Sequence, residues 1–270
     1  MDEITFEIRH MLSMNSTNNE IPSYTRFADL KRLDFIKNRL SKAIPSGGKV
    51  LDVGCGNGII SMHLGKEGYA VNGIDMSEKA VANANAKNPF TNVIFSVMDA
   101  ETLHASGQCY DAIICSEVLE HLHEPSRLLM QLYAILNKNG ILIVTVPNGN
   151  GPRESLVTKP YLALREKNNW AWRVVLNLKK MLGYSGTTVQ SAADNLDHIQ
   201  FFTTKQLKKL SADNGFIIEV INSSNFIDDV FPVSIVGSRS PFIQKVDSRL
   251  ADLLPVTFTG GYLMEWRKSS

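Results

Sequence analysis

The chain has 270 residues, of which 44% are hydrophobic, and its formal net charge at pH 7 is +1. This content can bury a full core, and the balanced charge excludes a general attraction to nucleic acid. The three cysteines have no metal-type spacing, which favours a reducing cytosol over a disulfide framework. The sequence lacks a run of about 18 apolar residues, so we expect a globular, cytoplasmic protein with neither a membrane span nor an export signal.

The predicted elements begin with a helix and continue as alternating strands and helices. Apolar residues at helical spacing predict a helix from about Tyr24 to Leu40. Next come strand KVLDVG, a helix near 59–66, strand AVNGID and a helix capped by Ser77. They are followed by strands NVIFSVMD and YDAIICSE, a helix from near Pro125 and strand GILIVTVPN. Such alternation predicts a doubly wound α/β fold, a parallel sheet with helices on both faces and ligands beyond the strands' carboxyl ends.

This pattern changes after Asn148. GNGPRE is predicted to be a loop, and the stretch up to Phe202 has no strand signal. A helix begins at Thr203, which can form a capping box with Gln206, and strand GFIIEVIN follows. A second irregular stretch precedes the apolar segment GGYLMEWRK. Because we predict no helix between these last two strands, we expect an antiparallel hairpin at the sheet edge.

A glycine-rich turn, in the run VLDVGCGNG, follows the first predicted strand. Its glycines are spaced G-x-G-x-G, one position shorter than the dinucleotide fingerprint G-x-G-x-x-G. Asp75 closes the next predicted strand, where a carboxylate can accept hydrogen bonds from both hydroxyls of a ribose. The two features predict a nucleotide-like ligand and fit NAD and S-adenosylmethionine equally well.

The order of the motifs resembles that of the class I S-adenosylmethionine-dependent methyltransferases. VLDVGCGNG, GID, MDAETL and YDAIICSEVLEHLHEP match that family's successive motifs over about residues 45–222. The resemblance implies S-adenosylmethionine as cofactor and a mostly parallel seven-stranded sheet with a C-terminal antiparallel edge hairpin. We therefore expect an N-terminal helical segment over 1–44 and a methyltransferase domain over 45–270. Within this domain we expect a lid-like insertion at about 149–202 and a second insertion at about 223–257.

The resemblance also implies roles for the motif residues. The glycine turn should bend around the methionine part of the cofactor with Asp52 in support, and Asp75 should bind the ribose. Adenine should meet Met76, the Asp99 carboxylate and the Ala100 amide. Ser116 and Glu117 should line the methionine end. The expected cofactor-binding residues are Asp52, Gly54, Cys55, Gly56, Gly58, Asp75, Met76, Asp99, Ala100 and Ser116.

A metal site is a further hypothesis. Glu117, Glu120 and His121 form E-x-x-E-H and would point the same way on a helical turn, a set that suits Mg²⁺ or Mn²⁺. His198, before the next predicted helix, is a candidate fourth ligand. The ubiquinone-pathway O-methyltransferases and the small-RNA 3′-terminal 2′-O-methyltransferases resemble this arrangement, which implies an ion that gathers vicinal hydroxyls and lowers a hydroxyl pKa.

Other roles stay open for the same side chains. Glu117 can contact the cofactor while His121 packs in the turn without any metal, and His198 can be a general base or a residue at a helix entry. The candidate catalytic residues are His198, Glu117 and His121.

Residues 159–182 form a basic amphipathic stretch with Trp170 and Trp172. It predicts a lid over the substrate, peripheral contact with an anionic membrane, or a homodimer surface. The sequence thus predicts O-methylation of a small-molecule or lipid-like acceptor. The alternatives are RNA 3′-terminal 2′-O-methylation with a divalent metal, for which the basic segment gives little support, and a module that binds S-adenosylmethionine without catalysis.

Overall fold

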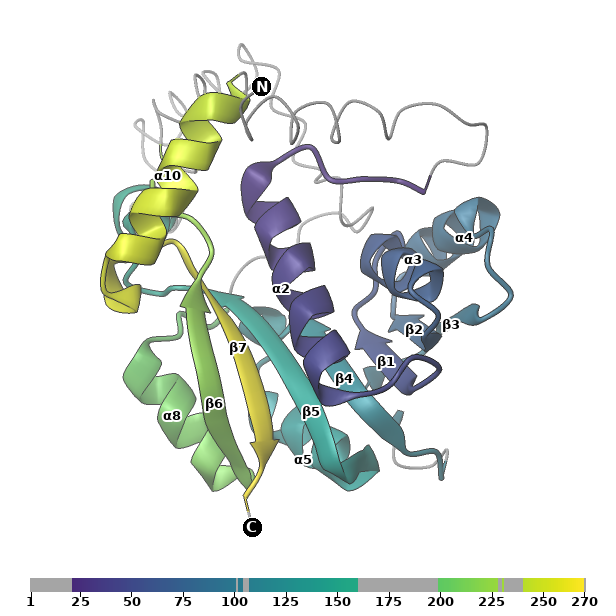
Figure 1. Cartoon of the computed structure of the whole chain (residues 1–270). Helices are drawn as coiled ribbons and strands as arrows, with labels where there is room; N and C mark the ends of the chain where they lie inside the picture. Colours follow the sequence, from purple (N-terminus) through teal and green to yellow (C-terminus); the bar gives the residue numbers. More distant parts are fainter. Residues whose placement is uncertain are drawn as a thin grey trace, which may run out of the picture.

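The computed structural model describes residues 21–100, 102–103, 107–159, 199–227, 230 and 240–269. Seven strands form one sheet in the order β3-β2-β1-β4-β5-β7-β6 (Figure 1). The strands are β1 (Lys49–Val53), β2 (Ala70–Asp75), β3 (Val93–Val97), β4 (Tyr110–Ser116), β5 (Leu136–Pro147), β6 (Phe216–Ser223) and β7 (Gly261–Lys268). The first five run parallel, while β7 pairs antiparallel with both β5 and β6. This confirms the predicted fold class.

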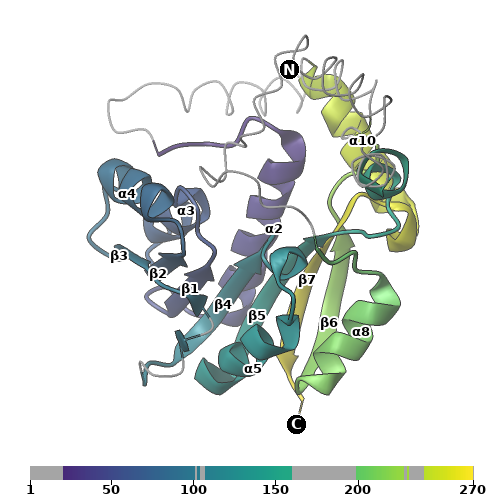
Figure 2. The same cartoon turned by 180° about the vertical axis from the view of Figure 1, so that it is seen from behind.

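Helices cover both faces of the sheet. They are α2 (Phe27–Ala43), α3 (Ile59–Lys66), α4 (Glu78–Lys87), α5 (Pro125–Ile135), α8 (Thr204–Asp213) and α10 (Pro241–Leu253), with short turns η2 (Leu119–His121), η3 (Glu154–Thr158) and η4 (Val256–Phe258). Figure 2 shows α5 and α8 on the face opposite α2. None of the helices in the described ranges is both long and apolar enough to cross a membrane.

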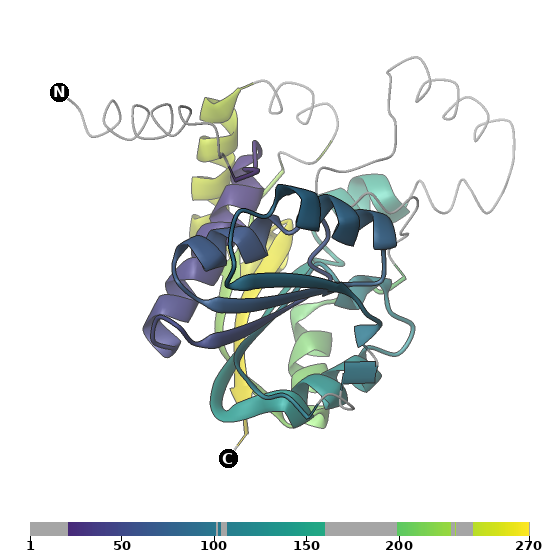
Figure 3. The same ribbon diagram turned by 90° about the vertical axis from the view of Figure 1, so that its right-hand side faces the viewer.

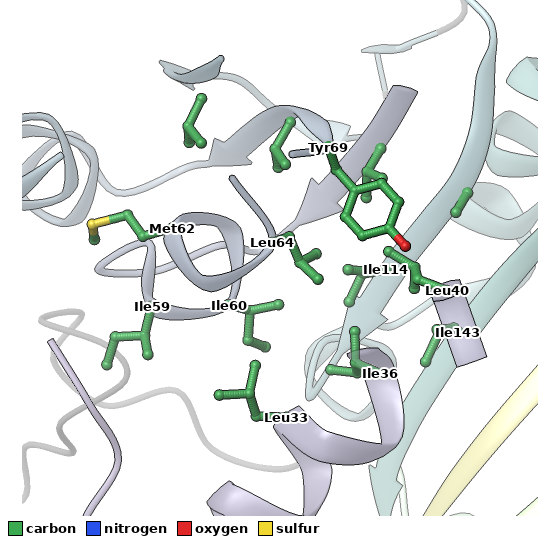
Figure 4. Packing of buried hydrophobic residues seen from close by; sticks show 14 of the residues in the cluster. Leu33, Ile36, Leu40, Ile59, Ile60, Met62, Leu64, Tyr69, Ile114 and Ile143 are labelled. Atoms are coloured by element: carbon green, nitrogen blue, oxygen red, sulfur yellow. The ribbon is translucent and has the colours of Figure 1, made fainter. Parts of the chain in front are cut away.

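Two apolar clusters form the core, one on each face of the sheet. On the α2 face, Leu33, Ile36 and Leu40 pack toward Ile114 and Ile143 of the central strands (Figure 4). The α5 face buries leucines of α5 together with Trp266 of β7. Helix α2 therefore belongs to the same core as the sheet, because it fills one face of it.

The helix start signals read from the sequence are confirmed. The Ser77 side chain accepts a hydrogen bond from the Ala80 amide at the start of α4, 3.2 Å away. At α8, Thr203 and Gln206 form the predicted capping box. Each cap satisfies an amide that the first helical turn would otherwise leave without a partner.

Two expectations about the second half of the chain are wrong. The predicted irregular stretch before the last strand contains the 13-residue helix α10, which follows the N-cap Ser240, so a helix does separate β6 from β7. The two strands still pair antiparallel at the edge of the sheet, as predicted, with β6 as the edge strand and β7 beside it. The predicted loop GNGPRE becomes helical from Pro152 and leads into the π-helical turn η3.

Candidate active site

The glycine turn after β1 adopts left-handed backbone conformations. The φ angles are 69° at Gly54, 53° at Gly56 and 77° at Gly58. A Cβ at Gly54 would lie 2.5 Å from Cγ2 of Val118, and one at Gly58 would lie 2.4 Å from Cζ of Phe95. Glycine at 54 and 58 is thus required by the protein's own packing as well as by the turn.

Asp75, at the end of β2, joins this turn to the start of α4. Its Oδ2 accepts a hydrogen bond from the Gly56 amide at 2.9 Å, and its Oδ1 accepts one from the Ser77 amide at 2.8 Å. Each carboxylate oxygen has a second lone pair that can accept a ligand hydroxyl. The carboxylate is therefore oriented at the carboxyl edge of the sheet by two backbone amides.

Beneath the turn, Asp52 is 1% exposed and accepts a 2.5 Å hydrogen bond from the Ser61 hydroxyl of α3. Burial, together with the charge of Asp75, raises the pKa of Asp52 to about 7. Cys55 is half-buried within the turn, and burial raises the pKa of its thiol, so the thiol stays protonated. Its position supports no nucleophilic role.

The residues expected beside adenine lie at the ends of β2 and β3. Met76 follows Asp75 with 72% of its surface exposed, so it is not part of the core. Asp99 is exposed, and its carbonyl accepts hydrogen bonds from the amide and hydroxyl of Thr102 at 3.0 and 2.8 Å. Ala100 packs at the edge of the second core cluster. The apolar surface of Met76 is accessible to a flat ligand.

Glu117 follows β4 with a φ of 57°, a value rarely adopted outside glycine. Its Oε1 accepts a 2.9 Å hydrogen bond from the Thr145 hydroxyl of β5. Because Thr145 uses its proton there, the Ser116 hydroxyl must donate the 2.8 Å bond between Ser116 and Thr145. Strained backbone held by surrounding contacts is frequent at functional sites.

Arg32 is a site residue that the sequence reasoning missed. This arginine of α2 is 6% exposed, donates to Asp29 at 2.8 Å and places its Nη1 3.7 Å from Oε1 of Glu117. Its Nε is buried without a hydrogen-bond partner among the described residues. The sequence does contain a signal for its burial. Arg32 comes four residues after Ala28 and four before Ile36, which places it on the buried face of the helix.

Glu120 lies three residues after Glu117, in the turn η2, and is 1% exposed. Glu117 precedes this turn in a left-handed conformation, so the predicted helical face shared by Glu117, Glu120 and His121 is not formed. Neither carboxylate oxygen of Glu120 accepts a hydrogen bond from the described part of the chain, and Nε2 of His121 lies 3.9 Å from Oε1. Burial and the charge of Glu117 raise the pKa of Glu120 well above its usual value. A carboxyl group in this environment favours its protonated form.

Three chain segments meet at Glu120. Its carbonyl accepts hydrogen bonds from the amides of Ile199 and Gln200, at 2.8 and 2.9 Å. His198 itself lies outside the described residues, so its predicted roles stay predictions. Glu154 of η3, which the sequence reasoning missed, is 1% exposed, and its charge also raises the pKa of Glu120.

The described residues do not fit a metal on their own. No group of three His, Cys, Asp or Glu side chains within the described ranges is arranged to hold an ion. Glu117 instead faces Thr145 and Arg32, and Glu120 is buried beside it. The predicted set of Glu117, Glu120, His121 and His198 thus has no support from its first three members.

Comparison with known proteins decides the family. A family model described as "Methyltransferase domain" matches residues 24–219, well over half of the chain. The chain belongs to the S-adenosylmethionine-dependent methyltransferases. The methyltransferase is 36% identical over 121 residues to a ubiquinone biosynthesis O-methyltransferase of Coxiella burnetii, covering 44% of this chain and 50% of that protein.

A mitochondrial ubiquinone biosynthesis O-methyltransferase of Rattus norvegicus is 32% identical over 131 residues, which cover 43% of the methyltransferase and 38% of the relative. The methyltransferase thus spans half or less of the length of these relatives. Magnesium protoporphyrin IX methyltransferase from Synechocystis PCC 6803, solved with bound S-adenosylhomocysteine, has a TM-score of 0.53 at 19% identity, over 98% of this chain and 95% of that one. That likeness shows the fold.

Proposed function

We propose that the methyltransferase transfers a methyl group to an oxygen of a small-molecule or lipid-like acceptor. The observation that carries this proposal is the juxtaposition after β4, where Ser116 and Glu117 are held by Thr145 at the same sheet edge as the glycine turn and Asp75. The partial matches to relatives named O-methyltransferases support oxygen as the methylated atom.

The chain's own residues supply the binding geometry in this proposal. The turn of Gly54, Gly56 and Gly58 would hold the methionine part of the cofactor, and Asp75 would accept from the ribose hydroxyls. When bound, S-adenosylmethionine supplies a sulfonium methyl group that an acceptor oxygen attacks in line. Arg32 holds Glu117 toward the end of β4, where this acceptor would enter.

The proton of the acceptor hydroxyl needs a base. His121 is the described imidazole beside Glu120, and the backbone bonds of Ile199 and Gln200 bring the chain that follows His198 to the same place. We propose His198 as the general base and His121 as the alternative. This proposed proton transfer uses only these side chains.

The acceptor class can be tested by incubating the full chain and tritiated S-adenosylmethionine with fractionated lysate from a strain that lacks the protein. We expect label in an organic-soluble or small-molecule fraction. Label confined to RNA, lost in EDTA, would favour the RNA 2′-O-methyltransferase instead. Tight binding of S-adenosylhomocysteine without transfer to any fraction would favour the non-catalytic module.

Other parts of the hypothesis stay predictions. The basic segment 159–182 lies outside the described residues except for Lys159, so its role as lid, membrane contact or dimer surface rests on the sequence alone. The cytoplasmic location rests on the cysteine usage and composition in the same way. A Glu120→Ala variant that keeps stoichiometric Mn²⁺ binding, or a wild type that binds none, would remove the metal hypothesis.

A further inference from the structure

A short segment before α2, residues 21–26, is packed onto the protein although it is neither helix nor strand. We call it the strap. Its Tyr24 is 7% exposed, and Ile21 packs against the first core cluster. Burial lowers the pKa of His63 on α3, and a hydrogen bond with the Pro22 carbonyl opposes this shift. Figures 1 and 3 show the strap at the end of the molecule where α2 begins, and in Figure 1 it runs on toward α3. The strap therefore contacts two helices.

Tyr24 joins the strap to Arg32, the buried arginine of α2. The guanidinium carbon of Arg32 lies 5.8 Å from the centroid of the Tyr24 ring. The Tyr24 side chain also forms a hydrogen bond with the guanidinium, in which the arginine is the donor because it has no acceptor atom. Aromatic rings attract guanidinium groups, and hydrogen bonds from a charged donor are among the stronger ones. Arg32 is thus held by the strap as well as by its own helix.

The two acidic partners of Arg32 hold it unequally. Its Nη2 donates to Asp29, three residues earlier on the same helix, at 2.8 Å. Its Nη1 is 3.7 Å from Oε1 of Glu117, which is longer than a hydrogen bond. Asp29 alone would leave the guanidinium free to rotate away from Glu117. Tyr24 lies outside the helix, so its contact restrains the rotation that Asp29 leaves open.

The contact between Arg32 and Glu117 matters for the cofactor site. Glu117 follows β4 with a left-handed backbone, at the place proposed for the methionine end of the cofactor. A guanidinium that turned toward Asp29 would leave the Glu117 carboxylate without its cation, which costs free energy in a partly buried place. A site whose charged groups are already in position loses less free energy when its ligand binds.

We propose that Tyr24 is a positioning residue for cofactor binding, which keeps the Arg32 guanidinium beside Glu117 at the end of β4. Tyr24 acts through Arg32, because its contact is with the guanidinium. The strap thereby takes part in cofactor binding although it lies outside every strand of the sheet. This role rests on the proposed place of the methionine part beside Glu117, but it does not depend on which acceptor is methylated.

The test is calorimetric titration of the full chain with S-adenosylhomocysteine. Tyr24→Phe keeps the ring and removes only the hydroxyl, and we expect the affinity to fall about tenfold. Tyr69→Phe is the matched control, because Tyr69 is 4% exposed in the same core cluster. It precedes β2, at the sheet edge opposite the glycine turn, so this variant should bind like wild type. Urea unfolding of each variant shows whether it is folded under the titration conditions.

A double-mutant cycle separates positioning from a general loss of structure. Since Tyr24 acts through Arg32, Tyr24→Phe should change the affinity little in an Arg32→Ala background. An equal loss with and without the arginine would overturn the proposal, because the hydroxyl would then act elsewhere. Wild-type affinity in Tyr24→Phe would also overturn it and would leave the proposed methyl transfer standing. A wild type that does not bind S-adenosylhomocysteine would overturn both this proposal and the proposed cofactor site.

Discussion

At the residue scale, Asp52 is a carboxyl group buried beneath the cofactor turn. Its pKa is about 7 in the folded protein, against about 3.9 for an exposed aspartate. Between these values the native state holds a proton that the unfolded state has lost, so this group's contribution to stability falls as the pH rises. Above the folded pKa the loss is complete.

We therefore expect Asp52→Asn to be relatively more stable at pH 7.5 than at pH 4.5. The difference in the free energy of unfolding between variant and wild type should change by about 2–4 kcal/mol across this window, following a shift of roughly three pKa units. The asparagine oxygen can still accept the Ser61 bond. Urea unfolding of both proteins at both pH values measures the change. The same difference in unfolding free energy at pH 4.5 and pH 7.5 would show that the pKa of Asp52 is not shifted.

Gly54 provides a second prediction at this scale. Gly54→Ala must both strain a φ of 69° and push against Val118, so we expect it to cost about 2–4 kcal/mol of stability. Gly47 has a φ of 86° with no atom within 4 Å of the place that a Cβ would take, so Gly47→Ala isolates the strain. Equal unfolding midpoints for the two variants would contradict the packing explanation.

At the element scale, α10 is held by its polar face. Asp247→Ala leaves the amides of Phe226 and Ile227 without their acceptor, and we expect a loss of about 2–4 kcal/mol in the free energy of unfolding. Asp252→Ala is the control, because it removes only an exposed ion pair with Lys31, worth about 0–1 kcal/mol. Denaturant unfolding distinguishes them, and similar losses would mean that α10 is held by other contacts.

The sequence could predict most elements but not α10. Helices α3 and α4 and the strands follow from hydrophobic runs, a glycine turn and cap residues, all of which are local signals. Helix α10 has an apolar period as well, but its buried face is polar, and the contacts that fix it come from residues about 20 and 220 positions away. Such long-range partners are invisible in a local window.

At the scale of the whole molecule, the candidate site combines distant segments. The motif residues around Gly54, Asp75 and Glu117 could be identified from spacing, since each follows a strand of a parallel sheet. The position of Arg32 on the apolar face of α2 indicates only that it is buried, and Glu154 gives no signal. Their link to the site could not be predicted, because the helix before the sheet and the turn after β5 reach Glu117 and Glu120 only in the folded chain.

This convergence predicts that Arg32→Ala weakens both stability and cofactor binding. It takes the guanidinium away from Asp29 and Glu117, which should cost about 2–4 kcal/mol of stability and at least about tenfold in affinity for S-adenosylhomocysteine. Arg39→Ala, on the same helix, removes an ion pair with Glu265 away from the turn and should leave the affinity unchanged. Calorimetric titration tests this, and equal affinities for both variants would limit Arg32 to a structural role.

The bridge from Asp75 to Gly56 and Ser77 consists of the protein's own atoms, a carboxylate and two backbone amides. Neither of its two hydrogen bonds involves the methyl group of the cofactor. S-adenosylmethionine and the product S-adenosylhomocysteine should therefore bind to the glycine turn in the same conformation. Little conformational entropy is then lost on binding, and the product is held nearly as well as the cofactor. We expect turnover to follow the ratio of S-adenosylmethionine to S-adenosylhomocysteine, which makes methylation sensitive to how fast the product is cleared.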